Sequence, residues 1–173
     1  MTIFNRYLSR YEESREETFS LQEYLDLCKK GPSAYASAAE RLLLSIGEPE
    51  MVDTRNDTRL SRIFQNKVLK IYPAFQEFHG MEDAIEQIVS YLRHAAQGLE
   101  EKKQILYLLG PVGGGKSSLA ERLKQLMERI PFYAIEGSPV FESPLGLFNP
   151  DEDGQILEDD YGIPRRYLRH IMS

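Results

Sequence analysis

The residues best suited to chemistry in this chain form one glycine-rich segment that ends in a lysine and a serine. The segment reads Gly110-Pro111-Val112-Gly113-Gly114-Gly115-Lys116-Ser117. Glycine has no Cβ atom, so backbone N–H groups can approach phosphate oxygens and φ can be positive. Lys116 is expected to reach the β- and γ-phosphates of a nucleotide as a point charge, and we assign it the catalytic role. The Ser117 hydroxyl is the predicted ligand of the Mg²⁺ ion that bridges those phosphates.

The sequence on either side of the glycines predicts the elements that hold them. The apolar run 104–109 predicts a strand, and apolar residues at helical spacing predict a helix over 118–129 whose positive dipole end faces the phosphates. With a second strand at 131–135, the order is that of a βαβ unit, so we expect a parallel sheet. The alternative is a glycine-rich turn followed by Lys-Ser by chance. In this phosphate loop (Walker A pattern) the predicted nucleotide contacts are Gly110, Pro111, Val112, Gly113, Gly114, Gly115, Lys116, Ser117 and Ser118.

Two further segments are weaker candidates for parts of a nucleotide site. Ile156-Leu157-Glu158-Asp159-Asp160 could supply the carboxylate that holds metal-bound water, but a solvated acidic segment is the favoured interpretation. Phe75, Phe78, His79 and Gly80 could form an aromatic and backbone pocket for a purine base. The alternative is that both Phe residues belong to the core and His79 lies on the surface.

The charge balance excludes several classes of partner. The 173 residues carry a formal net charge of −6, and nucleic acid or an anionic membrane needs a basic footprint that this chain lacks. Arg165, Arg166 and Arg169 form a local basic cluster, for which a solvated helix face is the favoured interpretation and contact with a phosphate or a neighbouring subunit the alternative.

Cys28 is the single cysteine, which fits a reducing compartment. No apolar run is long enough to span a bilayer, so we expect a cytoplasmic protein.

Helical patterns dominate the first fifty residues. Apolar residues recur at three- and four-residue spacing over 4–46. Ser20 and Glu23 have the spacing of a capping box, while Gly31-Pro32 and Gly47 predict helix ends. Residues 1–50 are therefore predicted to form a small helical module.

A connector and a second helical segment follow the module. Residues 51–79 are predicted to be a connector, extended and polar over 51–66, with a short strand at 67–72. An amphipathic helix is expected over 81–98, with Met81 on its apolar face. Beyond Glu136, glycines and prolines predict loops, with short helices at 155–160 and 167–172.

These residues carry a resemblance to a known family. His79-Gly80-Met81-Glu82-Asp83-Ala84-Ile85, followed by the run from Ile105 to Ser118, resembles an AAA+ ATPase module. With Ala39-Glu40-Arg41-Leu42-Leu43 and the segment from Tyr161 to Leu168, nearly the whole chain is similar to the bacterial PrkA family of serine protein kinases. The resemblance implies ATP and Mg²⁺ as cofactors, a protein substrate and a homo-oligomer of a longer parent protein. Only the residues of the phosphate loop carry over, since the later ATPase motifs of the family have no counterpart here.

The predicted fold class is α/β: an incomplete P-loop NTPase sheet of the AAA+ type, preceded by the helical module. The expected domains are 1–50, 51–79 and a truncated ATPase portion, 80–173. The favoured function is ATP–Mg²⁺ binding within a protein serine/threonine kinase that transfers the γ-phosphoryl group to protein serine. The alternative is a mechanochemical ATPase that remodels a protein partner; a small-molecule kinase is less favoured. Sensor residues and the carboxylate for metal-bound water are expected beyond Ser173.

Overall fold

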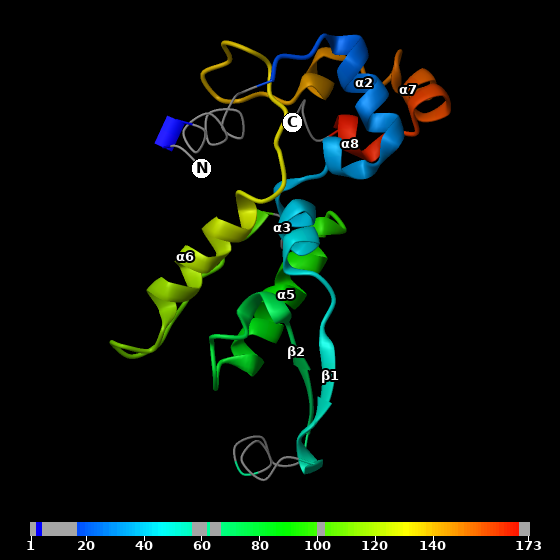
Figure 1. The fold of residues 1–173 in the computed structure, drawn as a ribbon. Coiled ribbons are helices and arrows are strands. Elements are labelled where there is room, and N and C mark those ends of the chain that lie inside the picture. Colours follow the sequence, from blue (N-terminus) through cyan, green and yellow to red (C-terminus); the bar gives the residue numbers. More distant parts are fainter. Residues whose placement is uncertain (1–2, 5–16, 57–61, 63–66, 100–102, 170–173) are drawn as a thin grey trace. The chain divides into compact units, whose positions relative to one another are not determined.

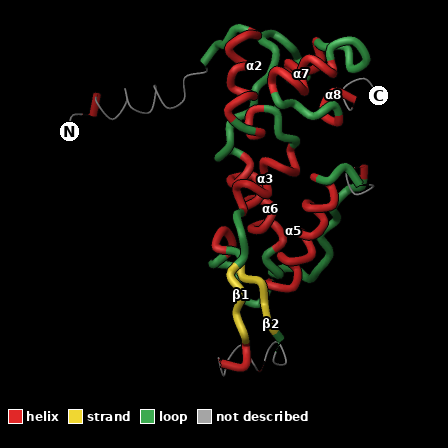
Figure 2. Tube along the Cα trace, turned by 90° about the vertical axis from the view of Figure 1, so that its right-hand side faces the viewer, coloured by secondary structure: helices red, strands yellow, loops and turns green. Residues whose placement is uncertain are grey.

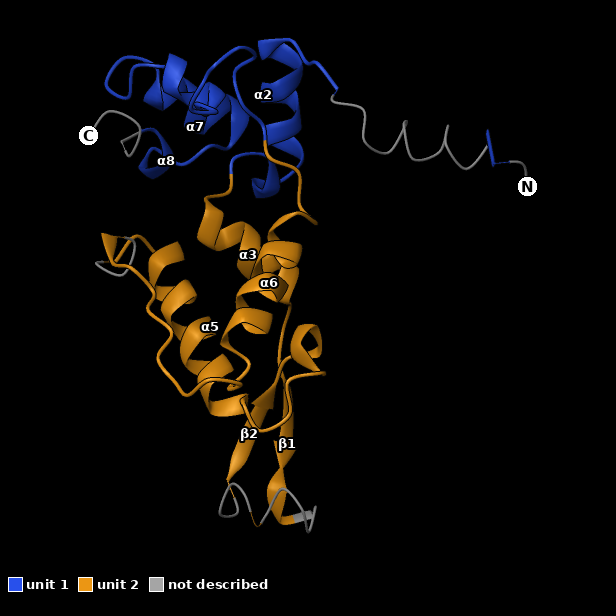
Figure 3. Cartoon of the chain, turned by 90° about the vertical axis from the view of Figure 1, so that its left-hand side faces the viewer, with its two compact units in different colours: residues 1–35, 133–173 blue, residues 36–132 orange. Residues whose placement is uncertain are grey.

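The two ends of the chain belong to one unit and its middle to another. Unit 1 comprises Met1–Tyr35 and Tyr133–Ser173, and unit 2 comprises Ala36–Phe132 (Figure 3). The computed structural model shown in Figure 1 describes residues 3–4, 17–56, 62, 67–99 and 103–169. None of the helices in these ranges is both long and apolar enough to cross a membrane.

In its described part, unit 1 is built from short helices. Helix α2 (Leu21–Lys30) begins at the predicted capping box: the Glu23 N–H donates to Ser20 Oγ at 3.3 Å, and the Ser20 N–H donates to the Glu23 carboxylate at 2.8 Å. The helix ends at Gly31, as predicted. The remaining elements are the 3₁₀ turns Pro32–Ala34 and Pro144–Leu147 and the helices α7 (Gly154–Tyr161) and α8 (Arg166–Arg169).

The core of unit 1 joins residues from both ends of the chain. One side of α2 buries apolar residues against the segment that follows Tyr133. The Tyr24 and Tyr133 rings lie 5.7 Å apart, and the Tyr24 hydroxyl donates to the Ala34 carbonyl at 3.5 Å. Burial raises the pKa of the Tyr24 hydroxyl and of the Cys28 thiol above their usual values. The core residues are Tyr24, Leu25, Cys28, Leu145, Leu157, Ile163 and Leu168.

The described residues of unit 2 combine three longer helices with a pair of strands. Helix α3 (Ala38–Ile46) starts at a second capping box, Ser37 with Glu40, and ends at Gly47 as predicted. Strands β1 (Glu50–Asp53) and β2 (Val68–Ile71) pair antiparallel (Figure 2). The remaining elements are the 3₁₀ turns Thr54–Asn56 and Pro73–Phe75 and the helices α5 (Glu82–Ala96) and α6 (Lys116–Met127).

The core of unit 2 lies where α3 packs against both α5 and α6 (Figure 3). The amphipathic pattern predicted for 81–98 is confirmed in α5, which buries its apolar face here. Polar contacts attach the neighbouring segments: Lys70 of β2 pairs with Glu86 of α5 at 2.6 Å, and the Tyr91 hydroxyl donates to the Gln104 carbonyl at 2.6 Å. The core residues are Leu42, Ile46, Tyr72, Ala74, Phe75, Ile85, Ile88, Val89, Leu92, Leu119 and Leu126.

The connector contains a strand that the sequence pattern did not predict. The strand expected at 67–72 is confirmed as β2, but its partner β1 begins at the last residue of the predicted helical module and continues into the segment expected to be a polar extended connector. Met51 and Val52 are flanked by Glu50 and Asp53, so β1 has little apolar signal of its own. Its pairing with β2 comes from residues that are distant in sequence, which local patterns do not report.

The parallel sheet expected around the phosphate loop is not formed in the described residues. Neither 104–109 nor 131–135 is a strand, although both segments contain the apolar residues that predicted one. A strand needs a neighbour for its ladder of backbone hydrogen bonds, and the described residues provide none beside these segments. The consequence is visible in the exposed fractions of Ile105, Tyr107 and Leu109, which are 91, 76 and 81%.

Some predictions concern residues outside the described ranges. These are the apolar positions Tyr7, Leu8 and Tyr11 of the first predicted helix, the connector at 57–61 and 63–66, and the end of the last helix at 170–172. The helices predicted at 118–129 and 155–160 are confirmed as α6 and α7, and the start of the last helix as α8.

Candidate phosphate-binding site

The loop before α6 has a backbone that only glycine accommodates easily. Gly113 and Gly115 have φ angles of +80° and +73°, in the left-handed region. Gly114 donates its N–H to the Pro111 carbonyl at 3.2 Å, and a Cβ atom on Gly114 would lie only 3.1 Å from that oxygen. The three consecutive glycines therefore allow a tight turn that leads into the first residue of α6.

The Lys116 side chain turns back into the loop. Its Nζ donates to the Gly110 carbonyl at 2.7 Å and to the Pro111 carbonyl at 2.5 Å. Both carbonyls belong to exposed residues, so water can replace the ammonium group if it moves. Lys116 thus holds a positive charge at the loop, and it can exchange backbone oxygens for phosphate oxygens.

Serine residues occupy the first turn of α6. Ser117 and Ser118 are exposed and line the cavity beside the loop. The N–H groups of this turn have no intrahelical acceptor, and the positive end of the α6 dipole lies here. An anion at this position would meet backbone donors, the Lys116 charge and a serine hydroxyl together.

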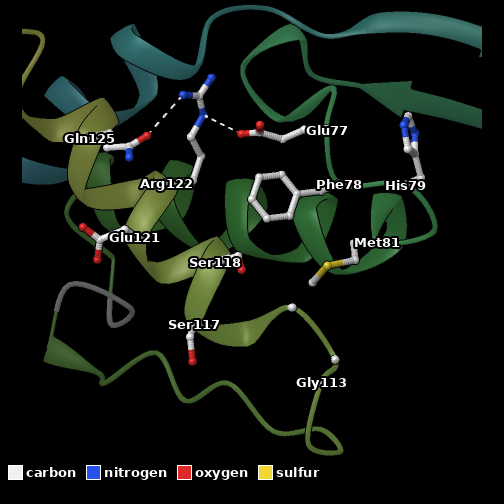
Figure 4. Close-up of a pocket in the computed structure, with 12 residues that line it drawn as sticks. Glu77, Phe78, His79, Met81, Gly113, Ser117, Ser118, Glu121, Arg122 and Gln125 are labelled. Atoms are coloured by element: carbon white, nitrogen blue, oxygen red, sulfur yellow. Dashed lines mark hydrogen bonds and ion pairs between the residues drawn. The ribbon is translucent and has the colours of Figure 1, made fainter.

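The cavity extends from the loop along one side of α6 (Figure 4). Its volume is about 980 Å³. The opposite wall is formed by the turn and loop before α5 and by Met81. The lining residues are Glu77, Phe78, His79, Met81, Gly113, Gly114, Gly115, Ser117, Ser118, Glu121, Arg122 and Gln125.

Arg122 connects the two walls of the cavity. Its Nε donates to the Ala74 carbonyl at 2.8 Å. One Nη donates to Gln125 Oε1 at 3.4 Å (Figure 4). Glu77 lies 3.7 Å from Arg122 Nε across the cavity. These contacts fix α6 to the turn that precedes α5, so the width of the cavity is determined by side chains as well as by the loop.

The predicted base-binding residues are only partly brought together. Phe75 is buried in the core, which matches the core interpretation, and its ring packs edge-on against the Phe78 ring, with 6.0 Å between the ring centroids. Phe78 and His79 line the cavity, while Gly80 does not. The structure thus brings two of the four candidates to the phosphate loop.

The other predicted candidates belong to unit 1 and are described there. Glu158, Asp159 and Asp160 are exposed on α7, in agreement with the solvated acidic segment. Arg165 hydrogen-bonds to Gln155, and its Nε lies 3.5 Å from a Glu158 oxygen. The Arg166 guanidinium lies over the Tyr167 ring, with its Cζ 5.0 Å from the ring centroid. For Arg169 only the backbone is described.

Several residues of the cavity were not found from the sequence. Glu77 precedes α5 without a motif, and helical spacing indicates a core position for Met81. Glu121, Arg122 and Gln125 follow Ser118 at three-, four- and seven-residue spacing, so they share one side of α6. That polar stripe is the signal that could have identified this wall of the cavity.

The donor set fits a nucleoside triphosphate with Mg²⁺. The glycine backbone leaves space that a Cβ atom would fill, Lys116 supplies a cation, and Ser117 supplies the hydroxyl oxygen that Mg²⁺ accepts as a ligand. Among the described residues there is no separate group of three or more His, Cys, Asp or Glu side chains that could hold a metal ion.

Comparisons with known proteins identify the family of this chain. The sequence profile described as the PrkA AAA domain matches residues 19–173. A protein named serine/threonine kinase YeaG, from Escherichia coli strain K12, is 67% identical over an alignment 177 positions long, which covers 100% of this chain and 28% of the relative. A protein named ATP-dependent protease PrkA, from Bacillus subtilis strain 168, is 33% identical over 169 residues, or 90% of this chain and 25% of the relative. No solved structure matches.

Proposed function

Because this chain belongs to the PrkA AAA domain family, we propose that it binds ATP with Mg²⁺ at residues 110–118. The observation that carries the proposal is the position of the Lys116 ammonium group, which is bonded to its own loop directly before the first turn of α6. When bound, ATP·Mg²⁺ supplies a transferable γ-phosphoryl group. Lys116 neutralises phosphate charge, Ser117 ligates the metal ion, and the loop residues other than Pro111, which has no N–H, donate backbone N–H groups.

We further propose that the longer protein is a kinase that phosphorylates protein serine. The chain spans 28% of the length of the relatives named serine/threonine kinase, so this activity concerns residues outside the chain as well. The same proposal includes a protein substrate, self-assembly of the longer protein and a cytoplasmic location, with neither nucleic acid nor membrane as a partner. It retains the domains 1–50, 51–79 and 80–173, with the last as part of an ATPase domain.

A second candidate function is ATP-driven remodelling or degradation of a protein partner. It is favoured by the relative named ATP-dependent protease, which is similar over 90% of this chain. Both functions use the same phosphate loop and act on a polypeptide, and they differ in the fate of the γ-phosphate.

Replacement of Lys116 tests the nucleotide site. Lys116→Ala in the chain of residues 1–173 should abolish ATP·Mg²⁺ binding measured by isothermal titration calorimetry. Lys124→Ala is the matched control, because Lys124 lies on the same helix and pairs with Glu121 at 3.2 Å. An unchanged affinity for ATP in Lys116→Ala would show that the site is elsewhere.

The fate of the γ-phosphate separates the two functions. The longer protein is incubated with a protein substrate and ATP labelled on the γ-phosphate. Label on serine supports the kinase, whereas rapid release of inorganic phosphate with no labelled protein supports remodelling. For residues 1–173 alone we expect weak ATP binding and little turnover, and robust hydrolysis by this chain would contradict that expectation.

A further inference from the structure

A methionine side chain touches the last glycine of the phosphate loop. A Cβ atom built on Gly115 would lie 3.0 Å from Met81 Sδ and 3.7 Å from Met81 Cε. The sulfur therefore rests directly against the Gly115 backbone, with no space for a side chain between them. Met81 immediately precedes α5 and Gly115 immediately precedes α6, so the starts of both helices meet at this contact.

Met81 is itself held firmly in unit 2. Its carbonyl accepts the Ile85 N–H at 2.9 Å, which is a first-turn hydrogen bond of α5. Its N–H donates to the Phe78 carbonyl at 3.4 Å. The side chain is partly buried and packs against the core cluster of unit 2. The position of Met81 is thus determined by α5 and the core, and not by the phosphate loop.

Gly115 transmits any displacement to the helix that follows. Its φ of +73° makes the sharp turn into α6, and its carbonyl accepts the Leu119 N–H at 2.9 Å. The N–H groups of Lys116 and Ser117 lie between these two fixed points. A shift of Gly115 by a few tenths of an ångström would move the donors that face a phosphate group.

We propose that Met81 is a positioning residue of the phosphate site. Its thioether braces Gly115, and through Gly115 the first turn of α6, in the arrangement that binds a triphosphate. The inference rests on the proposed function, because it concerns the same site. Met81 also lines the cavity, so direct contact with the nucleobase is the competing role. A ligand without a base distinguishes the two roles.

The experiment measures the affinity of residues 1–173 for two ligands, ATP·Mg²⁺ and inorganic tripolyphosphate with Mg²⁺. The graded variants are Met81→Leu, Met81→Val and Met81→Ala. Met51→Ala is the matched control, because Met51 lies on β1, is 62% exposed and does not line the cavity. Calorimetry gives both affinities, and far-UV circular dichroism shows whether each variant is folded.

Bracing of the loop predicts equal losses for both ligands. Met81→Ala should weaken both by about tenfold, which corresponds to about 1.4 kcal/mol and is the order expected for one impaired hydrogen bond to a charged group. Met81→Val should fall between Ala and Leu, and Met81→Leu, which conserves volume, should stay within about threefold of wild type. If Met81→Ala does not fold, the comparison of Val with Leu carries the same information.

Three results overturn the inference. A loss for ATP with an unchanged affinity for tripolyphosphate would mean that Met81 contacts the base. Unchanged affinities for both ligands in every Met81 variant would mean that the contact with Gly115 has no role in binding. If the wild-type chain binds neither ligand, the proposed function fails together with the inference that rests on it.

Discussion

The Arg122 side chain joins α6 to the turn before α5 by two interactions of unequal strength. Its Nε donates to the Ala74 carbonyl at 2.8 Å, and the Arg122 side chain is 22% exposed. A hydrogen bond from a charged donor contributes about 1.5–3 kcal/mol. The ion pair with Glu77 is longer, at 3.7 Å, and Glu77 is 67% exposed. Exposed pairs of this kind contribute about 0–1 kcal/mol. The bond to Ala74 should therefore dominate.

We expect Arg122→Ala to lower the free energy of unfolding of unit 2 by about 2 kcal/mol, in the range for loss of one charge-assisted hydrogen bond. For a unit of this size, each kcal/mol lowers Tm by about 4–8 °C. Glu77→Gln is the matched control, since it removes the ion pair and keeps the bond to Ala74. It should cost about 0.5 kcal/mol or less.

The assay is urea denaturation without nucleotide, followed by far-UV circular dichroism. Omitting nucleotide separates stability from binding, because Arg122 also lines the cavity. Equal costs for Glu77→Gln and Arg122→Ala would refute the reasoning, since the exposed ion pair would then be the stronger interaction. So would a cost below about 0.5 kcal/mol for Arg122→Ala, which is the lower limit for a typical hydrogen bond.

Three further predictions concern other parts of the chain. Gly114→Ala brings a Cβ atom to 3.1 Å from a carbonyl of the loop, so ATP·Mg²⁺ affinity measured by calorimetry should fall about tenfold; Gly31→Ala, which meets nothing within 4 Å, should change nothing, and equal affinities would contradict the steric argument. Tyr91→Phe removes the 2.6 Å bond to the Gln104 carbonyl and should lower stability in denaturant by about 1 kcal/mol; no change would show that this tether contributes nothing. Burial raises the pKa of the Tyr24 hydroxyl in the folded state. The Tyr24 contribution to the free energy of unfolding is therefore complete below the unfolded pKa of about 10. It is lost as the pH rises above that value, because the unfolded chain loses this proton first. Wild-type Tm should therefore fall more steeply above pH ~10 than that of Tyr24→Phe, and parallel pH profiles would argue against the burial effect.

The helices could be predicted from the sequence because their signals are local. The capping box of Ser20 with Glu23 and the glycines that end α2 and α3 act within a few residues of the helix termini. Strands depend on a neighbour that local sequence does not specify. The apolar residues of 104–109 form a continuous run, as in a buried strand, yet without a ladder partner in the described chain the segment is not a strand and is largely exposed.

The same distinction applies to the candidate site. The phosphate loop is contiguous, and its glycines, lysine and serine are recognisable by type and spacing. The opposite wall is not contiguous with the loop. Glu77 and Met81 come from a segment that precedes the loop by about thirty residues, which is about the length of one supersecondary unit. Sequence periodicity places Met81 on an apolar helix face, and its side chain does pack against the core of unit 2, but periodicity cannot show that the sulfur reaches Gly115.

Unit 1 is discontinuous, and this has a consequence for how the chain acquires its structure. Tyr24 of the first segment meets Tyr133 of the second only after all of unit 2 has been synthesised. Closing that loop costs entropy that grows with the logarithm of its length, and a prefolded insert shortens the effective loop. We therefore expect unit 2 to fold during synthesis and unit 1 to follow. Nucleotide present during translation could then stabilise the phosphate site before the two ends of the chain meet.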